Sequence, residues 1–110
     1  MREPNAAMEV ANSMSECMNA CAMLANRKAE AKRDEVLDAV SWFVEAAPLV
    51  DGPNLEGPKD MIRAGAAVAG RLKLAVIAWD GTTEPPASLV DLGREFLVAI
   101  GMPDLGKAGA

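Results

Sequence analysis

Apolar and polar positions alternate along the first half of the chain with the spacing of a helix. From Asn5 to Ala47 the sequence contains neither glycine nor proline. Apolar or small residues return there every three or four positions, which predicts helix over 5–47. These positions are Met18, Ala22, Ala25, Ala29, Val36, Val40, Phe43 and Ala47, with one gap at Lys32 and Arg33.

The length of this interval leaves two alternatives. A single helix over 5–47 would be about 64 Å long at 1.5 Å per residue, which the rest of the chain is too short to cover. A break near 26–34 would give two helices of ordinary length. However, 26–34 contains no glycine, proline, serine or threonine, which favours continuity. Both alternatives stay open at this point.

Proline and glycine divide the second half of the chain. Three prolines and two glycines in 48–58 predict a connection. A helix rich in alanine and glycine is expected over 58–80, with Pro58 at its start and Gly81 after its end. A turn over 81–88 leads to a short helix over 89–100, for which Ser88 and Asp91 resemble a capping box.

The remaining segments also fit an all-α fold. The tail over 101–110 is expected to fray. Alternating Leu72, Leu74 and Val76 would also suit a strand, but the alternation fails at Ile77. We therefore expect an all-α fold in one domain over 1–110. It would be a small helical bundle with a long N-terminal helix, a central Ala/Gly-rich helix and a short C-terminal helix.

Composition supports helix and removes several kinds of chemistry. The 110 residues are 51% hydrophobic but only 4% aromatic, and neither histidine nor tyrosine is present. Without histidine, one chain offers no Ser-His or Cys-His nucleophile pair and no imidazole ligand. We therefore expect a protein that is not an enzyme and has no cofactor.

Charge and hydropathy bear on partners and location. The net charge is −5, which disfavours general nucleic-acid binding, because phosphate contacts need clustered Lys and Arg. No apolar stretch is long enough to cross a membrane, because Arg71 and Lys73 interrupt the best candidate. Two close cysteines without an export signal indicate a reducing cytoplasm.

A sulfur-rich stretch, MSECMNACAM from Met14 to Met23, is the most distinctive local feature. Met14, Cys17, Met18 and Cys21 are soft ligands that would suit Cu(I). The same residues fit one apolar face of a helix, where cysteine behaves as a small hydrophobe. We expect packing, and a soft-metal or redox sensor using Cys17 and Cys21 is the alternative.

Two further patterns suggest other functions. Glu35 and Asp38 share a helical face and resemble the Glu-x-x-Asp half of helical Mg²⁺-dependent nucleotide pyrophosphatases, although the Glu-x-x-Glu half is absent. The segment Ala78 to Leu92, AWDGTTEPPASLVDL, resembles small phage tail-assembly proteins, in which a Trp-x-Gly turn precedes a Pro/Ser-capped helix. These resemblances imply, as alternatives, a Mg²⁺-dependent nucleotide hydrolase and a small phage-type inhibitor or assembly factor.

The leading prediction is a protein–protein interaction or regulatory module. Small residues such as Gly65 and Ala69 let another helix approach closely, and the long first segment needs a covering partner. We therefore expect a cytoplasmic homodimer that acts by binding a partner protein. Its interface is predicted at Val10, Met14, Cys17, Cys21, Leu24, Gly65 and Ala69.

Overall fold

Four α-helices form the fold of the protein. The computed structural model describes residues 6–51 and 58–106. The helices are α1 (Ala6–Asn26), α2 (Arg33–Ala46), α3 (Lys59–Ala78) and α4 (Ala87–Ala99), joined by the 3-10 helices η1 (Lys28–Glu30) and η2 (Ala47–Asp51) and followed by η3 (Pro103–Gly106). The predicted all-α class is confirmed. No strand occurs in the described ranges, because residues 72–78 belong to α3.

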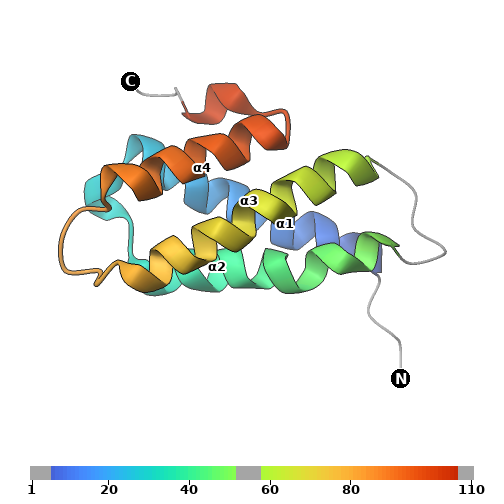
Figure 1. The fold of residues 1–110 in the computed structure, drawn as a ribbon, viewed down its shortest axis with the longest axis horizontal. Coiled ribbons are helices and arrows are strands. Elements are labelled where there is room, and N and C mark those ends of the chain that lie inside the picture. The colour runs from blue at the N-terminus through green and yellow to red at the C-terminus, as the bar shows by residue number, and fades with distance from the viewer. Residues whose placement is uncertain (1–5, 52–57, 107–110) are drawn as a thin grey trace.

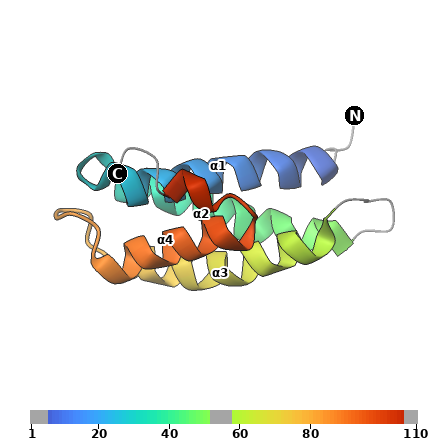
Figure 2. The ribbon, with the colours of Figure 1, turned by 90° about the horizontal axis from the view of Figure 1, so that it is seen from above.

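The helices run alternately up and down (Figures 1 and 2), and each packs against two neighbours. The order around the bundle is α1, α2, α3, α4 and back to α1. This places the α1–α2 pair opposite the α3–α4 pair. The two pairs therefore present separate outer surfaces.

The first segment is two helices rather than one. Asn26 ends α1, and η1 follows before Lys32 adopts an extended backbone with φ −107° and ψ 126°. The break lies at the gap in the apolar pattern. The break lets the apolar face of α2 fold back on that of α1. Burial of these two apolar faces against each other outweighs the cost of starting a second helix.

The core contains the largest buried side chains of all four helices. Phe43 of α2 and Phe96 of α4 meet edge to face, with ring centroids 5.6 Å apart and an interplanar angle of 80°. Gly65 of α3 lies against them, because a Cβ there would be 3.4 Å from Phe96 Cε1 and 2.8 Å from Ile100 Cγ2. The absence of a side chain at Gly65 therefore sets how closely α3 approaches the aromatic pair.

The predicted capping box at Ser88 is wrong. The helix α4 begins at Ala87, so Ser88 lies inside its first turn, and no side chain caps it. The carbonyl of Pro86 instead accepts hydrogen bonds from the N–H groups of Leu89 and Val90. Two successive prolines already fix the backbone entering the helix, so the start moves upstream of the serine.

Residues 103–106 are folded, although fraying is expected over 101–110. Residues 103–106 form η3, which packs on α4 and α1. The side-chain amide of Asn26 donates to the carbonyl of Leu105 over 2.6 Å. Residues 107–110 lie outside the described residues, as do 52–57 of the predicted connection and 1–5 at the N-terminus.

The helices of the described ranges are not membrane spans. None of them combines the length and the apolar character needed to cross a bilayer.

Candidate functional site

The sulfur-rich face of α1 lies inside the bundle. Cys17 and Cys21 are free, and both have 0% exposed surface. Gly93 of α4 packs closely on Cys21, because a Cβ at Gly93 would be 3.5 Å from the Cys21 carbonyl oxygen. Met14 and Met18 are partly buried beside the same core. The structure thus brings the four sulfur residues together as packing groups.

The protonation chemistry of Cys21 opposes metal binding and redox reactivity at this thiol. A hydrogen bond with Cys17, burial and the neighbouring Cys17 charge raise the pKa of Cys21 well above its ordinary value. The thiolate is the form that binds metals and reacts as a nucleophile. A soft ion at Cys17 and Cys21 would need both entry into a closed core and removal of the tightly held proton of Cys21. The arrangement favours packing over a sensor.

The other residues of the predicted interface are also interior. Val10 is 3% exposed, Leu24 and Ala69 are 0% exposed, and Gly65 is buried. A homodimer contact made by these side chains would require the four helices to separate. These residues therefore belong to the core of one chain, and an interface between copies would have to use exposed side chains instead.

The carboxylates Glu35 and Asp38 line a groove between α1 and α2. Two adjoining hollows of about 140 and 420 Å³ share Glu16, Glu35 and Ala39. In the part of the chain that the structure describes, no three His, Cys, Asp or Glu side chains lie close enough to hold a metal ion. The Mg²⁺-dependent hydrolase alternative therefore gains no support from the geometry.

The groove has an apolar floor and an acidic rim. Ala39 and Trp42 contribute to the floor, while Glu16, Glu35 and Asp38 are exposed at its edges. Trp42 is partly buried, and its indole Nε1–H donates to Oε1 of Glu9 over 3.3 Å. This hydrogen bond holds the indole at one end of the groove.

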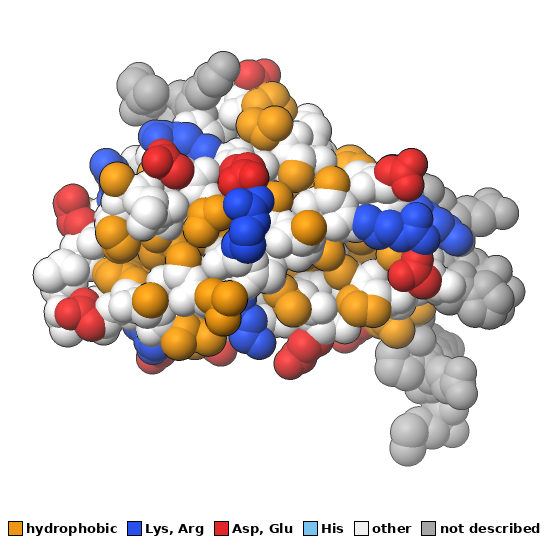
Figure 3. All heavy atoms as spheres, in the orientation of Figure 1, with side chains coloured by type: hydrophobic (Ala, Val, Ile, Leu, Met, Phe, Trp, Pro, Cys, Tyr) orange, Lys and Arg blue, Asp and Glu red, His pale blue; other side chains and the backbone are white. Residues whose placement is uncertain are grey.

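Most of the large exposed apolar side chains of the described residues belong to the α3–α4 half of the bundle. Of the large apolar side chains exposed in the described ranges, four belong to α3, α4 and the turn after α4: Leu74, Ile77, Val98 and Met102. We call them the α3–α4 surface. Figure 3 shows this face, where hydrophobic side chains lie over both helices with charged groups among them. Leu74 is the most exposed, at 69%.

The centre of this face carries an ion pair and a gap. Arg71 of α3 bonds Glu95 of α4, with 2.5 Å between Nη2 and Oε1. Gly70 beside it has no atom within 4 Å of the place its Cβ would occupy. Unlike Gly65, Gly70 packs against nothing within the chain. It leaves a small-residue position on the outer surface of α3.

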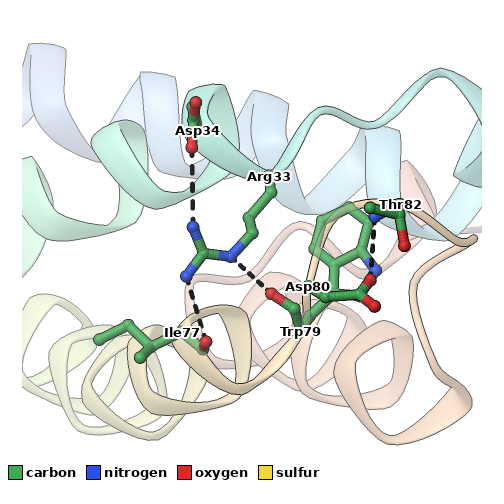
Figure 4. A network of polar contacts seen from close by, with 6 residues as sticks. All are labelled: Arg33, Asp34, Ile77, Trp79, Asp80 and Thr82. Atoms are coloured by element: carbon green, nitrogen blue, oxygen red, sulfur yellow. Dashed lines mark hydrogen bonds and ion pairs between the residues drawn. The ribbon is translucent and has the colours of Figure 1, made fainter.

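A polar network joins the start of α2 to the end of α3 (Figure 4). The Arg33 guanidinium donates through Nε to the carbonyl of Trp79 and through Nη2 to that of Ile77. These are carbonyls at the C-terminal end of a helix, where a positive charge is favourable. Within the following turn, Asp80 Oδ1 accepts from Thr82 N–H. The network is a structural clamp between helices.

Comparison with known proteins gives no relative for this chain. It matches no protein-family model, no curated protein and no solved structure. The resemblance of 78–92 to phage tail-assembly proteins therefore stays a prediction.

Both surfaces were missed by the sequence prediction, although each has a signal in the sequence. Leu74 and Ile77 stand out of phase with the buried face of α3. Glu16 stands on a helix that contains no Lys or Arg. The α3–α4 surface could have been found by looking for apolar residues off the buried face of a helix. The acidic surface could have been found by looking for acidic residues with no basic residue three or four positions away.

Proposed function

We propose that the protein is a non-enzymatic interaction module that forms a homodimer through the α3–α4 surface and binds a partner protein. The observation that carries the proposal is that four of the six large exposed apolar side chains of the described residues, Leu74, Ile77, Val98 and Met102, belong to α3, α4 and the turn after α4. Burial of such side chains between copies is the usual driving force of association.

The outer face of α3 is complementary to itself. Its N-terminal half carries the exposed small residues Ala64 and Ala67, and its C-terminal half carries the exposed Leu74 and Ile77. Two antiparallel copies of α3 crossing next to Gly70 would set Ala67 opposite Leu74 and Ala64 opposite Ile77. A two-fold interface requires this kind of reciprocal pairing. Gly70 at the crossing permits the two backbones to come close.

The charges at the crossing suit the same arrangement. Arg71 and Glu95 lie next to Gly70 on neighbouring helices. A two-fold axis there would bring Arg71 of each copy near Glu95 of the other. Positive and negative groups would then alternate around the axis, so the electrostatic complementarity is built from a single pair.

Sedimentation equilibrium tests the dimer. We expect a species of twice the 11.5 kDa chain mass at micromolar concentration. Leu74→Glu would place two carboxylates close to the axis and should raise the dimer Kd at least about tenfold, as expected for like charges at an interface.

The matched control is Leu49→Glu, which adds the same charge at another exposed leucine, in η2 and outside the α3–α4 surface. It should leave the dimer Kd unchanged. A strictly monomeric wild-type chain at micromolar concentration, or equal weakening in both variants, contradicts the proposal.

A further inference from the structure

We propose that the α1–α2 groove binds a short basic amphipathic helix of a partner protein. Apolar side chains of that helix would lie on the groove floor, and its Lys or Arg side chains would meet Glu16, Glu35 and Asp38. The inference gives a chemistry to the partner of the proposed interaction module. It uses the side of the bundle opposite the dimer surface, so the two ideas stand or fall separately.

The floor of the groove is made for apolar side chains. Ala20 and Met23 of α1 and Val36 and Ala39 of α2 line it, with Trp42 at one end. Small alanines on both walls leave room between two packed helices. A third helix placed in such a depression contacts both walls at once, which is the helix-in-groove mode of peptide recognition.

The rim of the groove carries negative charge that forms no ion pair within residues 6–51 and 58–106. None of the six ion pairs among the described residues uses Glu16, Glu35 or Asp38. The helix α1 contains no basic residue, and α2 contains only Arg33 at its first position, where it is engaged with α3. An acidic field over an apolar floor selects a ligand that is both basic and amphipathic.

Trp42 adds a second reason for a cationic ligand. Its indole is oriented by the bond to Glu9 and contributes to the groove lining beside Asp38. A Lys or Arg side chain placed against this ring would gain a cation–π contact as well as the nearby carboxylate. We therefore expect one basic residue of the ligand to lie at the Trp42 end.

The length of the groove sets the size of the ligand. From Glu16 to Met23 the wall extends about 10 Å along α1, at 1.5 Å per residue. This corresponds to about two turns of a docked helix. The ligand would thus present apolar side chains at spacings of three and four, flanked by basic residues.

The test is fluorescence anisotropy with a labelled amphipathic peptide of leucine and lysine, about 15 residues long so that a helix can form. We expect saturable binding that weakens as salt is added, because exposed charges are screened. Glu16→Gln with Glu35→Gln should raise the peptide Kd about tenfold, as two partly exposed ion pairs allow.

The matched control is Glu84→Gln with Asp104→Asn, which removes the same charge from exposed carboxylates outside the groove. It should change the peptide Kd less than twofold. In NMR spectra, the indole N–H signal of Trp42 should move on binding, while that of Trp79, which donates to the Thr83 carbonyl in the turn after α3, should not.

Four results would overturn the inference. They are absence of binding, equal binding of a peptide with glutamate in place of lysine, equal loss of affinity in the two double variants, and a fixed Trp42 signal in the presence of bound peptide. Because the dimer is measured by sedimentation without peptide, each of these failures leaves the dimer proposal untouched.

Discussion

Two glycines with nearly the same positive φ offer a controlled measurement of close packing. Gly81, in the turn after α3, has φ +80°, and Gly101, after α4, has φ +78°. A Cβ at Gly81 would lie 2.8 Å from Arg33 Cβ and 3.1 Å from Arg33 Cδ, whereas one at Gly101 would have no neighbour within 4 Å. Alanine at each position therefore shares one cost, and only Gly81→Ala adds a second.

The magnitudes follow from these two costs. A side chain in the left-handed region costs about 1 kcal/mol for either variant. At Gly81 the new carbon meets Arg33 next to its backbone, where the side chain has no freedom to turn away. Such overpacking adds about 1–3 kcal/mol. Gly101→Ala should thus lose about 1 kcal/mol and Gly81→Ala about 3 kcal/mol of unfolding free energy.

Urea denaturation followed by circular dichroism measures the difference. The excess in Gly81→Ala should come with disturbance of the clamp, seen as a change in the NMR signal of Arg33 Nε–H, which bonds the Trp79 carbonyl. If the two variants lose equal stability, the close contact between the turn and Arg33 does not contribute, and the reasoning is refuted.

Other substitutions test burial and protonation. Gly70→Ala should stabilise a chain kept monomeric by about 0.5–1 kcal/mol, because helix propensity rises with no clash. Gly65→Ala should destabilise the same chain by about 1–3 kcal/mol, because the new Cβ would lie 2.8 Å from Ile100 Cγ2. In thermal melts, the melting temperature should rise for Gly70→Ala and fall for Gly65→Ala. The raised pKa of Cys21 contributes stability that is present below the unfolded pKa of about 8.5 and lost as pH rises, so Cys21→Ala should flatten the alkaline decline in urea titrations. The hydrogen bonds from Thr82 lower the pKa of Asp80, giving stability above about pH 4 that is lost as pH falls; Asp80→Asn should reduce this acid dependence, and an unchanged acid profile would contradict it.

The helices could be predicted because each buries one face. The buried positions are apolar and recur every three or four residues, which the sequence shows directly. The break between α1 and α2 could only be left as one of two alternatives near 26–34. Nothing in residues 27–32 interrupts a helix locally, and the break is favoured only because Val36, Val40 and Phe43 reach the core by folding back. That gain depends on residues distant in the chain, which a local pattern does not record.

The candidate surfaces show the same limit. An apolar face packed within one chain and an apolar face packed against a second copy have the same sequence pattern. The sequence therefore could not tell whether Cys17 and Cys21 lie at an interface or in the core, and the structure buries them in the core. Gly65 and Gly70 are alike in sequence, yet only Gly65 touches another helix. Glu16 and Glu35 line one groove only after the chain has reversed direction.

The closed position of the two cysteines makes the protein a natural reporter of its own opening. They are the only thiols in the sequence, and neither is in contact with solvent. A thiol reagent added to the native protein therefore reacts only with molecules whose four helices have come apart. When the reagent is fast, the labelling rate equals the rate of opening. The two cysteines of α1 thus allow the opening rate of this bundle to be measured without an engineered label.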